Sequence, residues 1–96
     1  MAHYIALIHK DPDSSFGVSF PDVPGVFAAG DTIDEAIGQA AEALAFAAED
    51  WTNLAGMPFP GARTIDALRK DPEFVDSAAE AIVAAVPLRA SAEAAA

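Results

Sequence analysis

The sequence contains no cysteine, which excludes a disulfide framework and any metal site built on thiolates. It also has no run of about 18 apolar residues, the length that a membrane-spanning helix needs. The chain does not open on a basic segment followed by an apolar one, so we expect no secretory signal. These absences predict a single soluble domain of the cytoplasm.

Basic residues are also scarce. The 96 residues include 15 aspartates and glutamates but only 5 lysines and arginines, which gives a formal net charge of −10. Because binding to nucleic acid phosphates needs clustered lysine and arginine, we expect no direct contact between this chain and nucleic acid. An acidic surface favours solubility, and it also attracts basic partners.

The segment 20–25 has the composition of a rigid turn, with the sequence Phe-Pro-Asp-Val-Pro-Gly. Pro21 and Pro24 each fix φ near −65° and remove a backbone donor, so neither flanking strand can continue through them. Gly25 can supply the positive φ that such a turn often needs. We therefore expect a stiff corner between two strands.

Three segments before residue 30 have the character of strands. Residues 3–9 form an apolar run with both faces apolar, which is typical of a central strand. Residues 16–20 alternate between large apolar and small side chains and predict a half-buried antiparallel partner. Residues 26–29 predict a short third strand. Together they predict a three-stranded antiparallel meander, with a loop over residues 10–15.

A long helix is predicted from Ile33 to about Trp51. Thr32 is a suitable N-cap, and Glu35 three residues later completes a capping box. The helix is expected to end over residues 53–56. Apolar residues recur at spacings of three and four, and the resulting stripe consists of Ile33, Ile37, Ala40, Leu44, Ala47 and Trp51.

The segment after this helix predicts a proline-rich connection and then a short second helix. Residues 57–61 read Met-Pro-Phe-Pro-Gly. Thr64 is a suitable N-cap for a helix that runs to about Lys70. The pair Asp71-Pro72 is expected to stop that helix, because a residue before proline is displaced from the α region.

The last ordered element is predicted to be a strand over residues 81–88, although the alanine-rich composition of this segment also suits a helix. A crossover through the long helix would return this strand to the same sheet. Residues 1–88 then form one α+β domain in the order β-β-β-α-α-β. Residues 89–96 have no large apolar side chain and are expected to fray.

No catalytic constellation is evident. His3 and His9 lie about 20 Å apart along one strand, so they cannot share a metal ion. Asp11 and Asp13 flank a proline in a loop, where solvated acids rarely have the raised pKa that acid–base catalysis needs. The loop serines have no histidine partner. We therefore expect no enzyme activity, no catalytic residue, no metal and no cofactor.

The order of these motifs resembles the HicB antitoxin family. The resemblance rests on the strand 4–8, the turn segment 16–25 and the helix start 29–36, and it continues through residues 60–68 and the strand end 86–88. Its most specific part is the combination Phe-Pro-Asp-x-Pro-Gly followed by Gly-Asp-Thr-x-x-Glu-Ala. Either half alone is a weak signal.

This resemblance implies a partial ribonuclease-H-like fold and a protein partner, the HicA toxin, a small basic RNA-cleaving protein of the double-stranded-RNA-binding type. The antitoxin would mask the toxin's surface. A working ribonuclease H needs a carboxylate on its first strand, where this chain has Ile5-Ala6-Leu7-Ile8. Many family members also carry a C-terminal ribbon-helix-helix or helix-turn-helix segment. No such pattern is evident here, so the resemblance does not imply that this chain binds DNA.

The leading functional hypothesis is therefore an antitoxin-like interaction module that masks a HicA-type toxin. One alternative is a stand-alone HicB-like scaffold that forms a dimer or tetramer; another is a residual metal-dependent nuclease that uses Asp22 and Glu35. Trp51 suits either core packing or an interface. The residues predicted to bind the partner are Phe20, Pro21, Asp22, Pro24, Gly25 and Trp51.

Overall fold

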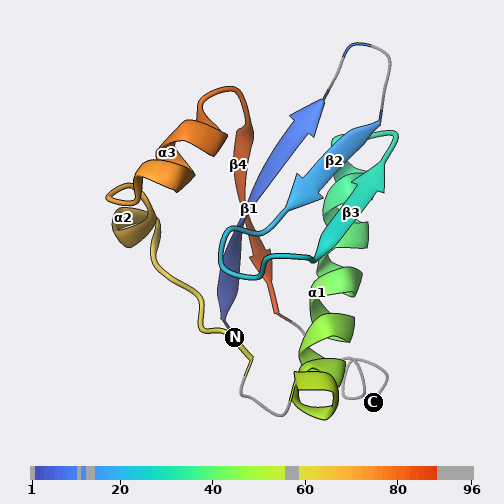
Figure 1. Cartoon of the computed structure of the whole chain (residues 1–96). Helices are drawn as coiled ribbons and strands as arrows, with labels where there is room; N and C mark the ends of the chain where they lie inside the picture. The colour runs from blue at the N-terminus through green and yellow to red at the C-terminus, as the bar shows by residue number, and fades with distance from the viewer. Residues whose placement is uncertain (1, 11, 13–14, 56–58, 89–96) are drawn as a thin grey trace.

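Four antiparallel strands form one sheet at the centre of the molecule (Figure 1). The computed structural model describes residues 2–10, 12, 15–55 and 59–88. The strand order is β3-β2-β1-β4, which confirms the predicted meander, the central first strand and the return of the last strand to the same sheet. The strands are β1 (His3–Lys10), β2 (Phe16–Ser19), β3 (Phe27–Gly30) and β4 (Ile82–Pro87).

Helices cover both faces of the sheet, and β1 supplies side chains to both layers (Figure 1). Tyr4, Ala6 and Ile8 pack with the long helix on one face. Leu7 packs with Leu68 and Phe74 from the two short helices on the other face. The predicted apolar character of both faces of β1 is therefore confirmed. The helices are α1 (Ile33–Ala55), α2 (Ile65–Leu68) and α3 (Pro72–Ala78).

The junction between β3 and α1 is capped and closely packed. The Thr32 Oγ1 accepts a hydrogen bond from the Glu35 backbone N–H at 3.1 Å. The Glu35 carboxylate accepts in turn from the Asp31 N–H at 3.5 Å, one residue earlier than in a standard capping box. A Cβ on Gly30 would lie 2.5 Å from the Ala36 nitrogen. Gly30 thus lets the helix start directly above the end of the strand.

The face that α1 buries differs in part from the predicted stripe. Ala40 and Leu44 are fully buried as predicted, but Ile33 is 37% exposed, so its assignment to the buried stripe is wrong. Alanines dominate the contact because their small side chains let the helix approach the sheet closely. The helix runs to Ala55, which lies within the end region predicted over residues 53–56. Among residues 33–51 of α1, for which the structure describes burial, the buried residues are Ala36, Ala40, Ala41, Leu44 and Ala45.

The pair Asp71-Pro72 starts a helix as well as ending one. The predicted cap of α2 is confirmed, because the Thr64 Oγ1 accepts from the Ala67 N–H at 3.1 Å. α3 was not predicted. The Asp71 carboxylate accepts from the Glu73 N–H at 3.0 Å, and Pro72 occupies the first turn of α3, where its missing donor has no cost.

The predicted fourth strand is confirmed as β4, which pairs with β1 from Ile8↔Ile82 to His3↔Pro87. The tail predicted over residues 89–96, Gly56 of the predicted helix end, and Met57 and Pro58 of the predicted connection lie outside the described residues.

Candidate interaction surface

The turn between β2 and β3 is anchored in the core, and its tip faces solvent. Phe20 and Val23 are 3% and 0% exposed, and the Val23 N–H donates to the Phe20 carbonyl at 3.1 Å. Gly25 has φ 95°, as the sequence predicts. Pro24 and Gly25 are exposed. The buried ring of Phe20 supports this surface from below, whereas the tip is accessible to another molecule.

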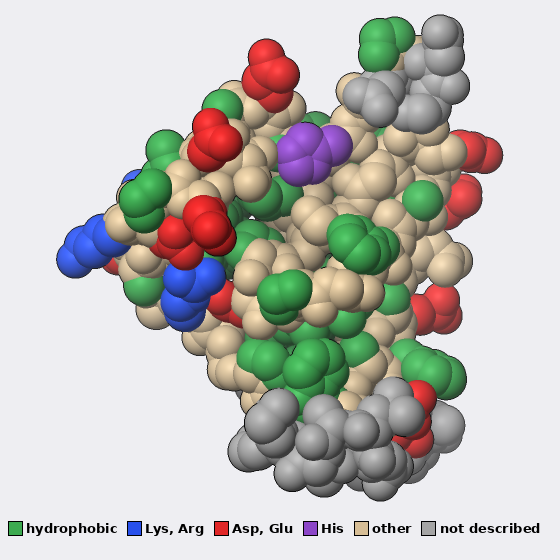
Figure 2. Space-filling model, in the orientation of Figure 1, with side chains coloured by type: hydrophobic (Ala, Val, Ile, Leu, Met, Phe, Trp, Pro, Cys, Tyr) green, Lys and Arg blue, Asp and Glu red, His purple; other side chains and the backbone are tan. Residues whose placement is uncertain are grey.

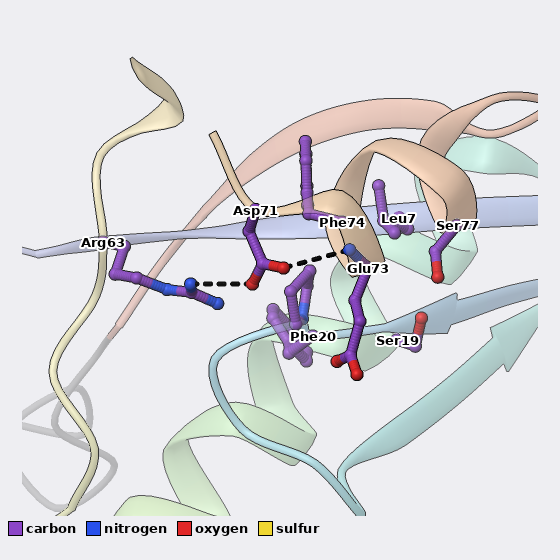
Figure 3. Close-up of a pocket in the computed structure, with 9 residues that line it drawn as sticks. Leu7, Ser19, Phe20, Arg63, Asp71, Glu73, Phe74 and Ser77 are labelled. Carbon is purple, nitrogen blue, oxygen red and sulfur yellow. Dashed lines mark hydrogen bonds and ion pairs between the residues drawn. The ribbon is translucent and has the colours of Figure 1, made fainter. Parts of the chain in front are cut away.

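An arginine joins this turn to the start of α3. The Arg63 backbone N–H and Nε donate to the two carboxylate oxygens of Asp22 at 2.7 and 2.5 Å. Its Nη1 donates to the Asp71 carboxylate at 3.0 Å (Figure 3). The Asp22 side chain is only 6% exposed. We call these three residues the Arg63 bridge.

Contacts within the Arg63 bridge shift the pKa values of Arg63 and Asp71. Hydrogen bonds to Asp22, and then to Asp71, raise the pKa of the Arg63 guanidinium. The hydrogen bond from Arg63, followed by that from the Glu73 backbone N–H, lowers the pKa of the Asp71 carboxyl group. Asp71 therefore stays ionised and both holds Arg63 and caps α3.

A pocket of about 170 Å³ lies beside the Arg63 bridge, between the end of β2 and α3 (Figure 3). Leu7, Phe20 and Phe74 give it an apolar wall. Glu73 is exposed and extends from α3 towards the β2 side of the pocket (Figure 3). The pocket can accept the apolar stem and cationic head of a lysine or arginine. Its other lining residues are Ser19, Pro21, Arg63, Asp71 and Ser77.

Acidic side chains continue from this pocket across α3. Glu73 and Asp76 are exposed on α3 at a spacing of three residues, and the exposed Glu80 lies in the turn that follows this helix. On a helix, such a spacing places side chains near one another. Figure 2 shows acidic side chains gathered over this part of the molecule, with basic side chains next to them.

A family comparison identifies the chain. The sequence model of the HicB-like antitoxins of bacterial toxin–antitoxin systems matches residues 4–94. This chain belongs to that family. No protein with a curated description matches the HicB-like chain. The family and the fold that the sequence resemblance implied are therefore confirmed.

Solved structures resemble the HicB-like chain over most of its length. The antitoxin HicB of Burkholderia pseudomallei is 33% identical, with a TM-score of 0.73 over 95% of this chain and 66% of that one. Its N-terminal domain is 31% identical, with a TM-score of 0.70 over 91% and 98%. A chain from the HicA3 and HicB3 toxin–antitoxin complex is 28% identical, with a TM-score of 0.69 over 91% and 98%. The HicB-like chain thus spans slightly less than two thirds of the whole B. pseudomallei antitoxin.

Trp51 of the HicB-like chain packs against the connection that follows α1. Its ring meets Phe59 edge-on, with the centroids 5.6 Å apart, and Phe59 lies 5.6 Å from Tyr4. The Tyr4 hydroxyl donates to the Pro60 carbonyl. Burial, followed by the charge of Asp22, raises the pKa of Tyr4. The buried Tyr4 and the half-buried Trp51 and Phe59 fix the connection against β1. Partner binding by Trp51 remains a prediction.

The two residues of the nuclease alternative, Asp22 and Glu35, are held by other groups of the chain. In the described part of the chain, no three histidines or carboxylates are grouped so as to hold a metal ion. Asp22 is engaged in the Arg63 bridge and Glu35 in the cap of α1. His9 contacts the Ser77 carbonyl at 3.1 Å.

In the part of the chain that the structure describes, no helix is long and apolar enough to cross a membrane.

Replacing Asp71 by asparagine should remove a pH-dependent part of the stability. Asparagine caps helices as well as aspartate does, so the change mainly removes the ion pair with Arg63. Because the folded pKa of Asp71 is lowered, its contribution is present above the unfolded value of about 3.9. The contribution is lost as the pH falls through the folded pKa.

We therefore expect the wild type to melt at a higher temperature than Asp71→Asn at pH 7. That difference should shrink below about pH 4. Melting curves of both proteins at pH 7, 5, 4 and 3 measure it. A difference that stays constant over this range would show that the charge of Asp71 does not contribute.

Proposed function

We propose that the HicB-like chain is an antitoxin without enzyme activity, which neutralises a small basic RNA-cleaving toxin of the HicA type by covering its surface. The observation that carries the proposal is the likeness to a chain of the HicA3 and HicB3 complex, which this chain matches over 98% of that chain's length. The net charge of −10 supports it, because acidic surfaces accelerate and orient association with basic proteins.

The surface proposed to meet the toxin consists of the exposed turn tip, the pocket and the acidic side of α3. Glu73 would pair with a lysine or arginine of the toxin whose apolar stem enters the pocket. Pro21 and Pro24 stiffen the turn, so little conformational entropy is lost when a partner docks on it. The predicted binding residues Phe20, Pro21, Pro24 and Gly25 all belong to this surface or support it.

Asp22 is expected to support the proposed toxin-binding surface indirectly, by holding Arg63 in place. Its carboxylate is almost completely buried and holds Arg63 by two hydrogen bonds. Asp22→Lys would place a second cation against Arg63, and we expect a loss of at least about 2 kcal/mol in the free energy of unfolding. Toxin binding should fall in parallel with stability. Normal melting together with lost binding would instead assign Asp22 a direct contact.

Co-expression with the HicA-type toxin of the same genome tests the proposed function. The HicB-like chain should co-purify with the toxin and relieve its growth arrest. Glu73→Lys should weaken the complex at least about tenfold, because it repels the incoming cation. Failure to co-purify, with growth arrest unrelieved, would contradict the proposal.

Asp34→Lys is the matched control. Both acids are exposed and lie in the first turn of a helix. Each change therefore shifts the net charge by +2 and places a cation at a helix N-terminus, against the helix dipole. Only Glu73 lines the pocket. Equal weakening by the two variants would show that net charge, and not this surface, sets the affinity.

A further inference from the structure

One face of the sheet is only half covered. α1 packs behind β2 and β3, whereas α2 and α3 lie on the opposite face beside β1 and β4 (Figure 1). Within the part of the chain that the structure describes, no helix lies in front of β2 and β3 on that face (Figure 1). A sheet buries its faces against a second layer, so this open area is a surface that a partner protein can cover.

The open face is lined by small side chains and one large ring. In antiparallel strands, residues directly opposite each other point to the same face. Phe27 is 71% exposed and borders a hollow of about 360 Å³, whose floor includes the small residues Gly17 and Ser19. The floor therefore leaves room beside the ring. The two rows of opposite residues on this face are Leu7↔Ser19↔Phe27 and His9↔Gly17↔Ala29.

This hollow continues into the pocket beside the Arg63 bridge. Ser19 lines both of them. His9, which lines the hollow, contacts the carbonyl of Ser77, which lines the pocket. We call this continuous depression, from Phe27 to α3, the sheet trough. β1 and β3 are two inter-strand spacings apart, about 10 Å, and this is the width of one α-helix.

The two sides of the sheet trough differ in charge. No carboxylate lines the hollow near Phe27. On the other side, Glu73 extends from α3 towards β2 (Figure 3), and Asp76 is exposed on the same helix. This pattern matches an element with an apolar stripe and a basic edge. A second copy would bring a net charge of −10 against these acids, and a partner strand would pair with a sheet edge instead of a face.

We propose that one amphipathic helix of the toxin occupies the sheet trough. Its apolar stripe would cover Ser19 and Phe27, and its basic edge would meet Glu73. The helix would complete the layer that α2 and α3 begin, and the small Gly17 lets it approach the sheet closely. The inference rests on the proposed function, since the toxin is the partner, and it adds which kind of element the toxin contributes and where that element lies.

Gly17→Tyr separates binding from folding. Apart from the adjacent residues, a Cβ on Gly17 meets only the His9 carbonyl oxygen, at 3.9 Å, and tyrosine suits a strand better than glycine does. The melting temperature should therefore stay unchanged or rise. Toxin binding should weaken at least about thirtyfold, because the ring fills the place of the helix.

Phe27→Ser is an independent variant, and it should weaken toxin binding at least about tenfold. Phe46→Ser is its matched control, because Phe46 is similarly exposed, at 67%, but lies on α1. Calorimetric titration of the purified toxin gives each affinity. If the wild type binds the toxin and both trough variants bind it equally well, this inference is wrong and the proposed function stands. If the wild type does not bind, both are wrong.

Charge exchange tests whether the occupant is a helix. The binding that Glu73→Lys loses should be restored when one lysine or arginine of the toxin is changed to glutamate. That residue should lie on a toxin helix, with apolar residues three or four positions away. Restoration only by a residue on a strand or loop of the toxin, or by none of its basic residues, would overturn the inference.

Discussion

Replacing Gly30 by alanine is expected to be among the most damaging single changes in the HicB-like chain. The added Cβ would lie 2.5 Å from the Ala36 nitrogen and 2.9 Å from the Ala36 Cα, both backbone atoms of α1. The first turn of α1 would have to move away from β3. We expect a loss of about 3 kcal/mol, which lowers the melting temperature of so small a domain by roughly 15 °C.

Gly38→Ala is the matched control for this prediction. Gly38 lies inside α1, and beyond the neighbouring turns of its own helix no atom lies within 4 Å of the place that a Cβ would take. Alanine favours the helix over glycine there by about 0.5–1 kcal/mol. The same substitution should therefore destabilise at position 30 and stabilise at position 38. Thermal unfolding of both variants measures this, and a Gly30→Ala protein that melts within a few degrees of the wild type would refute the proposed close packing.

The second large loss of stability is expected for Phe74→Ala. Phe74 is 5% exposed and packs with Leu7 and Leu68 in the cluster between β1 and the short helices. This small cluster holds α2 and α3 against the sheet. Removing the ring should cost about 3–5 kcal/mol. It should also disturb the pocket, because Phe74 forms part of its wall.

Val75→Ala controls for the loss of a large apolar side chain from the same helix. Val75 is 51% exposed, so its truncation should change the free energy of unfolding by no more than about 0.5 kcal/mol. Urea unfolding of the two variants gives both values. Equal destabilisation would mean that α3 is not held by the Phe74 ring.

The parts of the fold that local chemistry determines could be predicted from the sequence. The alternation over residues 16–20 and the prolines and glycine of the next turn define the meander. Thr32 and Thr64 each mark a helix start by accepting a hydrogen bond from a backbone N–H three residues later. These signals act within a few residues, so they can be recognised in the sequence without knowledge of the tertiary contacts.

The parts that were missed depend on context or on distant contacts. Asp71-Pro72 disfavours helix before it and favours helix after it; a prediction based on the first effect alone omits α3. The Arg63 bridge joins residues 41 positions apart, for which no local pattern exists. Ile33 fits the helical period, yet it lies on the exposed side because α1 packs through its alanines.

We propose that this chain silences a toxin by covering it. Titrating the purified chain into an RNA cleavage assay with the HicA-type toxin of the same genome tests that claim most directly. We expect cleavage to fall to background at a fixed ratio of chain to toxin. The Glu73→Lys variant should require a large excess, and the chain alone should cleave no RNA. Cleavage that persists at saturating wild-type chain, or RNA cleavage by the chain itself, would contradict it.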